Sequence, residues 1–327
     1  MYYFINYLRT IATILITNSH YSNIWPIADL AAGGLLGNIL FFATSGFCLF
    51  NVKENFGKWY LKRLRVYPVM ILFTLLTILG GGYTLQSGTD VVRLFLYPTN
   101  YIFLVWLMLC YVIFYVVAWL SKRYDKITGT TLAVVLGIWI LTYFIFIDKS
   151  VYHIDDVSKP FILFLYFSSM LVGALFKKHI DKFGKIKIVN IVLLFVSLIV
   201  YFGSKIAFSK IQFIVFWQIF NQLSILVVLY FMFAVFIGLE DCFKKIPNWI
   251  NKAVKFVAGI TLHIYLVQFV VIRAFESLIF PLNFLVTTVM ILAAASALYF
   301  AEYFIRKGIY ILSRRQKEKK KNAESND

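Results

Sequence analysis

The sequence predicts an all-α integral membrane protein, a bundle of about ten transmembrane helices with both termini in the cytoplasm. The chain of 327 residues is 61% hydrophobic and only 14% charged. A soluble protein of this length would need far more polar surface to cover its core. Apolar runs with almost no charge recur from one end of the chain to the other, and each is long enough to cross a bilayer.

The ten apolar segments follow one another without a linker of different composition. Their expected bounds are 4–20, 30–50, 66–82, 101–120, 130–147, 161–176, 188–208, 213–238, 253–275 and 279–304. We therefore expect one transmembrane domain over residues 1–310. Residues 311–327 are polar and basic, and we expect them to form a disordered cytoplasmic tail.

The distribution of the basic residues predicts the orientation in the membrane. If successive spans cross the membrane in opposite directions, the loops and tail on one side hold 24 Lys and Arg, whereas the loops on the other side hold five. Such an excess of positive charge is typical of the cytoplasmic side. The net charge of +17 is therefore first an orientation signal, and we expect the bilayer rather than nucleic acid to be the partner.

The sequence offers no sign of a disulfide framework, a metal site or a nucleotide-binding loop. Cys48, Cys110 and Cys242 lie in or beside apolar segments at unrelated spacings, so we expect no zinc site and no other metal. Neither a Walker loop nor a dinucleotide fingerprint is present. No internal repeat is visible, which argues against a transporter built from duplicated halves.

The first apolar segment carries a stripe of polar side chains. His20 follows Arg9 by eleven residues, which on an α-helix places it about 20° around and about 16 Å further along the same face. Asn6, Thr13 and Thr17 fall within about 60° of this line. Because lipid disfavours such a stripe, we expect it to face a protein interior or an aqueous cavity.

The predicted orientation puts Arg9 toward the cytoplasm and His20 toward the outer side. A cation at one depth and an imidazole at another suit a reaction between an anionic donor from inside and an acceptor from outside, with His20 as general base. Two simpler interpretations remain open. Arg9 could extend its guanidinium to the membrane surface, and His20 could hydrogen-bond a loop.

The polar stripe and several further motifs resemble the acyltransferase 3 family of multi-pass membrane acyltransferases. The motifs follow in the family's order along the chain: NILFFATSGFCLF (38–50), WYLKRLRVYPVM (59–70), FLVWLMLCY (103–111), FLYFSSMLVGALF (164–176) and ITLHIYLVQFVV (260–271). Three positions depart from the family pattern. Ile102 precedes Phe103 and Leu104 where the family often has Trp-Phe-Leu. Asn6 stands where an aspartate is common, and Lys62 stands where the first of two arginines is common, so its planar fork is missing.

The resemblance implies an acyl donor, usually acetyl-CoA, that is held near the cytoplasmic surface. The basic loop contains Lys62, Arg63 and Arg65, whose side chains can bind the 3′-phosphate and pyrophosphate of coenzyme A. We expect Lys62 and Arg65 to point the same way on a helix. Ser45 belongs to a small Ser-Gly pair that permits close helix packing and could also let a pantetheine arm pass. A topology anchor on anionic lipid is the alternative for the loop.

Other polar residues in apolar segments are expected to face the bundle interior. His263 and Gln268 could line a cavity or hydrogen-bond between helices. Gln218, Asn221 and Gln222 share one segment, and Glu302 lies deep in the last one. The sequence assigns no role to these six residues. The basic loop at 177–187 is expected to be an anchor.

The sequence and the resemblance together imply a membrane O-acyltransferase. It would transfer an acetyl or other acyl group from cytoplasmic acetyl-CoA to a hydroxyl of a cell-surface polysaccharide or its lipid-linked precursor, in the bacterial plasma membrane. Arg9 would hold the donor or stabilise the oxyanion, and His20 would accept the proton. The alternatives are a lipid-linked glycan exporter without catalysis, a polysaccharide polymerase and a catalytically inactive assembly factor. The oligomeric state is left open.

Overall fold

The computed structural model describes residues 2–80, 87–96 and 102–324, and this part of the chain is helical with no β-strand. In chain order the α-helices are α1 (Tyr3–Asn18), α2 (Gly34–Leu49), α3 (Phe56–Leu61), α4 (Val66–Leu79), α5 (Gly88–Leu96), α6 (Ile102–Leu120), α7 (Ile127–Phe146), α8 (Ile162–Lys178), α9 (Ile188–Lys210), α10 (Ile219–Gly238), α11 (Glu240–Lys245), α12 (Asn248–Gly259), α13 (Thr261–Phe275) and α14 (Leu282–Glu324). Short 3₁₀ helices occupy Ala28–Leu30, Ile180–Phe183 and Gln212–Trp217.

Each of the ten predicted segments contains a helix, but fewer than ten are long enough to cross a membrane alone. Among the described residues, six helices are sufficiently long and apolar: α2 with its leading turn, α6, α7, α9, α10 and the first part of α14. The pair α12 and α13, bent by 70°, makes a seventh if it counts as one span. Helices α1, α4 and α8 have 16, 14 and 17 residues, short of the ~20 that a bilayer requires. The count of ten is therefore not confirmed.

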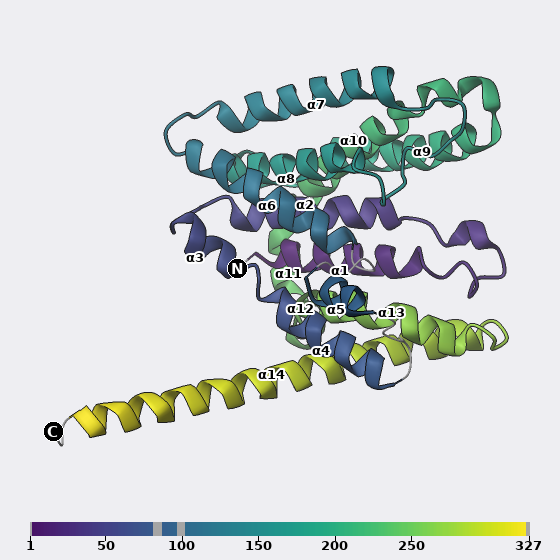
Figure 1. The fold of residues 1–327 in the computed structure, drawn as a ribbon. Helices are drawn as coiled ribbons and strands as arrows, with labels where there is room; N and C mark the ends of the chain where they lie inside the picture. The colour runs from purple at the N-terminus through teal and green to yellow at the C-terminus, as the bar shows by residue number, and fades with distance from the viewer. Residues whose placement is uncertain (1, 81–86, 97–101, 325–327) are drawn as a thin grey trace.

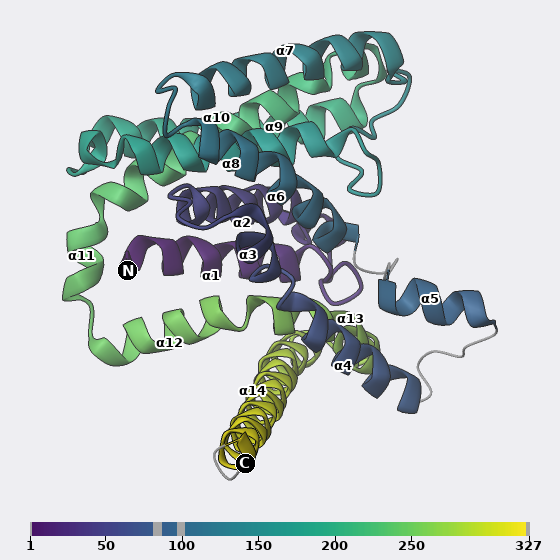
Figure 2. The same ribbon diagram turned by 60° about the vertical axis from the view of Figure 1, so that its left-hand side comes forward.

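Helices α1 and α2 form the middle of the bundle (Figure 1). Helices α7 to α10 lie on one side of them, and α4, α12, α13 and α14 lie on the other. Figure 2 shows α1 running beside α12, and α13 continuing beyond the bend. Because α1 packs against both groups, the polar stripe that it carries lies inside the protein.

The start of α1 is held by a carboxylate from a distant helix. Its first residues contain no side chain that caps the helix. Instead, Glu240 of α11 accepts hydrogen bonds from the backbone N–H groups of Tyr3, at 3.0 Å, and Phe4, at 2.8 Å. A negative charge at this end also complements the helix dipole. The contact fixes the position of α1 relative to the α11–α12 corner.

Two glycines allow the closest helix contact in the core, between α2 and α8. A Cβ atom at Gly46 would collide with the backbone oxygen of Met170, and one at Gly173 would collide with that of Ala43. The two helices therefore touch through their backbones at both points. Packing is thus a structural role of Gly46, as expected for the Ser-Gly pair.

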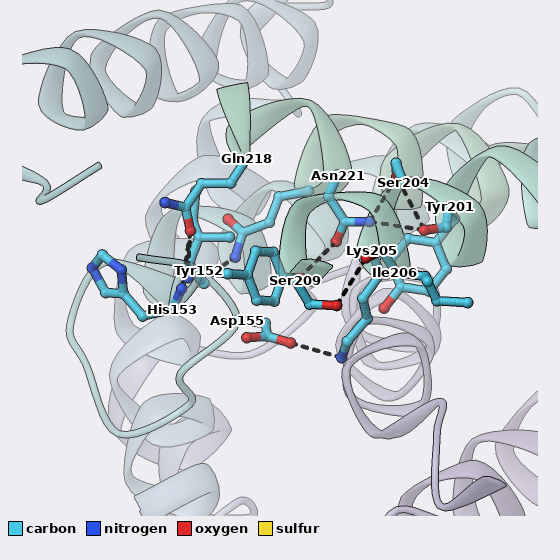
Figure 3. Close-up of polar contacts among 12 residues, drawn as sticks. Tyr152, His153, Asp155, Tyr201, Ser204, Lys205, Ile206, Ser209, Gln218 and Asn221 are labelled. Atoms are coloured by element: carbon cyan, nitrogen blue, oxygen red, sulfur yellow. Dashed lines mark hydrogen bonds and ion pairs between the residues drawn. The ribbon is translucent and has the colours of Figure 1, made fainter. Parts of the chain in front are cut away.

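A polar network anchors the loop between α7 and α8 to α9 and α10 (Figure 3). Gln218 accepts hydrogen bonds from the backbone N–H groups of His153 and Ile154, at 3.0 and 3.1 Å. Asn221 donates to the backbone oxygen of Tyr201 at 2.8 Å. Gln218, Asn221 and Gln222 are all fully buried. The polar side chains of this segment thus face the interior, as expected, and hold the loop in place.

Helices α7 and α9 present apolar side chains outward. Only 11% of the α7 window and 17% of the α9 window are buried inside the protein. The exposed residues are large and apolar, for example Leu141, Ile145, Phe195 and Ile199. Such a surface is compatible with hydrocarbon but not with water.

Helix α14 is longer than any predicted segment. It runs from Leu282 to Glu324 without a break, and Figure 1 shows it projecting well beyond the other helices. It thereby continues through most of 311–327, the segment expected to be a disordered tail, and no structural boundary marks residue 310.

Candidate functional site

A cavity of about 580 Å³ lies between α1, α2, the α3–α4 turn, α6, α13 and α14. Its volume is within the range typical of small-molecule sites, about 300–1,000 Å³. Apolar side chains form most of the wall, including Phe41, Leu104, Leu107 and Leu262. The polar residues that line it are Arg9, Thr13, Thr17, Thr44, Ser45, Lys62, Arg63, Arg65, Tyr111, Thr261, His263, Tyr265, Gln268, Tyr299, Glu302, Tyr303 and Arg306.

Arg9 lines this cavity from α1 and is half-buried. Its guanidinium carbon lies 5.9 Å from the centre of the Phe41 ring. None of the ion pairs in the described part of the chain involves Arg9. A partly buried cation without a carboxylate partner favours an anionic ligand, because its charge is otherwise poorly compensated.

Lys62, Arg63 and Arg65 lie in the turn between α3 and α4, and all three line the cavity. The expected helical face shared by Lys62 and Arg65 is therefore absent, because α3 ends at Leu61. The turn nevertheless brings both residues to the same cavity.

The three basic side chains differ in the contacts that they make with other residues of the protein. Lys62 forms an exposed ion pair with Glu54, and the hydrogen bond from Lys62 holds the pKa of the Glu54 carboxyl below its ordinary value. Arg63 donates to the backbone oxygen of Trp59 at 2.8 Å, and its guanidinium lies 4.2 Å from the centre of the Trp59 ring. Arg65 is exposed, and no ion pair within the described residues involves it.

Ser45 is half-buried and lines the cavity, next to the backbone contact made by Gly46. The Ser-Gly pair thus serves both packing and the cavity wall. Its glycine faces α8, whereas its serine faces the space beside Arg9.

His20 does not line the cavity. It follows the last residue of α1, and its ring centre lies 4.5 Å from that of Phe269 on α13. Thr17, three residues before His20, and Gln268, the residue before Phe269, do line it and hydrogen-bond to each other at 3.1 Å. The structure therefore brings Arg9, but not His20, to the cavity with the basic turn.

The imidazole that lines the cavity is that of His263, to which the sequence assigns no role. Its Nε2 lies 2.7 Å from a carboxylate oxygen of Glu302, and the other carboxylate oxygen pairs with Arg306. Arg306 in turn donates to the backbone oxygen of Arg65 at 2.7 Å. This chain of contacts links the middle of the cavity to the basic turn. The only signal in the sequence was the presence of polar residues in apolar segments.

Two further hydrogen bonds join α1 to α13 along the cavity. Thr13 and Thr261 contact each other through their hydroxyl groups at 3.0 Å. Thr17 donates to Gln268 one turn further along α1. The stripe predicted on the first segment therefore faces α13, where the bent pair α12–α13 has its break.

The described residues contain no group of three or more His, Cys, Asp or Glu side chains that could hold a metal ion. The cavity lining instead combines basic residues with an imidazole–carboxylate pair. Such a donor set suits an anionic organic ligand with a long apolar part.

Comparison with known proteins gives one positive result. The family model described as an acyltransferase domain, acyltransferase 3, matches residues 2–302. The match covers α1 to α13 and the first part of α14, and it includes every residue that lines the cavity except Tyr303 and Arg306. No curated protein and no solved structure matches the chain.

Proposed function

The chain belongs to the acyltransferase 3 family, and from this premise we propose that it is an integral membrane O-acyltransferase that uses an acyl-coenzyme A thioester, usually acetyl-CoA. The observation that carries this proposal is the cavity lined by Arg9 and the basic turn. Coenzyme A has phosphates at one end and a thioester at the other, joined by a slim arm. A cavity lined by several cations and by mostly apolar walls suits such a ligand.

In the proposed reaction, the phosphates of coenzyme A are bound by Lys62, Arg63 and Arg65, on the side of the membrane where the basic loops lie. The acceptor hydroxyl attacks the thioester carbonyl carbon, the carbon–sulfur bond breaks, and the coenzyme A thiolate leaves. His20 takes the hydroxyl proton, and Arg9, about 16 Å away along α1, holds the donor by a charge-assisted hydrogen bond. A relay through an acyl-imidazole is the other route that these residues allow.

The role proposed for His20 determines how far the thioester must reach. His20 does not line the cavity, and its ring lies 4.5 Å from that of Phe269, the residue after Gln268 on α13. For direct transfer, the thioester must therefore extend beyond the cavity to reach the imidazole. The acceptor, which we propose to be a surface polysaccharide or its lipid-linked precursor, then approaches from the opposite side.

The test is acyl transfer by the purified protein in lipid nanodiscs, with labelled acetyl-CoA and a polysaccharide acceptor. Replacing His20 by alanine should abolish transfer and leave coenzyme A binding unchanged, because His20 lies outside the cavity. His179→Ala is the matched control, since His179 lies in a loop at the end of α8, and it should retain full activity. Transfer by the His20→Ala protein would remove His20 from the mechanism.

The same assay separates the enzyme from its main rival. A glycan exporter without catalysis has no reason to bind coenzyme A. If the wild-type protein neither binds coenzyme A nor consumes acetyl-CoA, the acyltransferase proposal is wrong.

A further inference from the structure

Three aromatic side chains follow one another along the cavity wall, starting beside Arg9. Phe41, Phe103 and Tyr265 come from α2, α6 and α13, and all three line the cavity. The Arg9 guanidinium lies 5.9 Å from the centre of the Phe41 ring. The ring centres are 5.5 Å apart between Phe41 and Phe103, and 5.6 Å apart between Phe103 and Tyr265. Rings at these distances are in contact, so they form a continuous aromatic row across three helices.

The aromatic row continues beyond the cavity to His20. The ring centre of Phe269 lies 6.5 Å from that of Tyr265 and 4.5 Å from that of His20. Neither Phe269 nor His20 lines the cavity. Phe269 is therefore the last member of the row, and it contacts the imidazole that the proposed reaction uses as its base.

The helical period of α13 accounts for the place of Phe269. Leu262, Tyr265 and Phe269 are three and four residues apart, so they lie within about 60° of one another around the helix. Leu262 and Tyr265 line the cavity. Phe269 lies one turn further along the same face, about 6 Å beyond Tyr265. This face of α13 thus leads from the cavity to the side of His20.

The ring of Phe269 limits the space beside the imidazole, because the two rings are in contact. Phe269 is nevertheless 39% exposed, whereas Phe103 is only 8% exposed and is held by its neighbours. An acyl group that extends from the cavity to His20 must pass the edge of the Phe269 ring. Each further methylene of that group adds volume at the same point.

We propose that Tyr265 and Phe269 form an aromatic selector that lets an acetyl or propionyl group reach His20 and excludes longer acyl groups, an inference that rests on the proposed function. The substrate class of the site is then the short-chain acyl thioesters of coenzyme A. Neither residue takes part in the bond changes. The two rings act on the acyl chain by contact and by excluded volume.

The experiment measures kcat/KM for acetyl-CoA and for butyryl-CoA, with the full-length protein in nanodiscs and the same polysaccharide acceptor. Wild type should prefer acetyl-CoA. Phe269→Ala removes the ring, so it should raise the ratio of the butyryl-CoA value to the acetyl-CoA value by at least about tenfold. Phe269→Leu should raise this ratio by less. It keeps the position apolar, so the comparison stands even if the alanine variant does not fold.

Phe144→Ala is the matched control. Phe144, on α7, is 41% exposed, close to the exposed fraction of Phe269, and its ring centre lies 5.9 Å from that of Phe216. It does not line the cavity and does not belong to the aromatic row. This substitution should leave the ratio of the two kcat/KM values unchanged.

Three results would overturn the selector. Wild type that uses butyryl-CoA as well as acetyl-CoA would show that no selection exists. Phe269 variants with an unchanged ratio, including those that lose activity with both donors equally, would show that the ring only supports the structure around His20. The same rise of the ratio in Phe144→Ala would show that the effect is not local. Wild type that transfers from neither donor would instead refute the proposed function, and the selector with it.

Discussion

Arg9 is the residue whose surroundings say most about the ligand. Its guanidinium contacts the Phe41 ring, but no carboxylate in the described residues pairs with it. Asn6, on the same helix face, is neutral and supplies no negative charge. An anionic or polarised group of the proposed donor would therefore meet a cation that no carboxylate of the described residues neutralises.

Replacing Arg9 by alanine should lower kcat/KM for acyl transfer by about 10- to 100-fold, the effect of losing one hydrogen bond from a charged group to the donor. Arg9→Lys should recover part of this loss, because it keeps the charge but not the planar fork. Both values come from initial rates of acetyl transfer. Arg123→Ala is the control, since Arg123 also contacts an aromatic ring, that of Tyr124, but does not line the cavity. A similar loss in the control would contradict the assignment.

At the scale of single elements, the contact between α2 and α8 decides where the cavity wall lies. Gly46 brings the backbone of α2 against that of α8, and Ser45 then faces the cavity. A methyl group at position 46 must push the two helices apart. The displacement would also move Ser45 relative to Arg9, so packing and ligand binding are linked at this point.

Gly46→Ala should lower the thermal unfolding temperature in detergent, since overpacking of a close contact costs about 1–3 kcal/mol. Gly137→Ala, on α7, is the matched control. A Cβ atom there meets nothing within 4 Å, and alanine favours helix by about 1 kcal/mol. The control should therefore unfold at the same or a higher temperature. A decrease of the same size in both variants would show that the α2–α8 contact is not the cause.

For the whole molecule, the orientation in the membrane decides which end of the cavity receives the donor. The basic turn at Lys62–Arg65 lies on the side that carries the excess of Lys and Arg. If that side is cytoplasmic, coenzyme A can enter directly. The bend of 70° between α12 and α13 lies next to the cavity, because Gly259 and Thr261 line it on either side of the break.

Labelling of single cysteines tests this orientation. In a protein whose native cysteines are replaced, Lys159→Cys in the α7–α8 loop should react with an impermeant maleimide on intact cells. Lys126→Cys, in the α6–α7 turn, should react only after the cells are lysed. Both lysines are exposed, so accessibility within the protein does not explain a difference. The reverse pattern would place the basic loops outside and exclude donor entry from the cytoplasm.

The sequence by itself determined the class of the molecule and the face of the first helix that carries the polar stripe. The composition predicted membrane helices, and the helical period placed Arg9, Thr13 and Thr17 on one side of the first helix. Both conclusions depend only on local regularities, which each helix obeys alone.

Only the tertiary structure decided which side chains meet across helices. His263 and Glu302 are 39 residues apart, and no period along the chain predicts that α13 and α14 turn these two groups toward each other. The same holds for His20, which shares the side of Arg9 by spacing yet lies outside the cavity. Such pairings depend on the rotation and close packing of neighbouring helices, which a one-dimensional pattern does not contain.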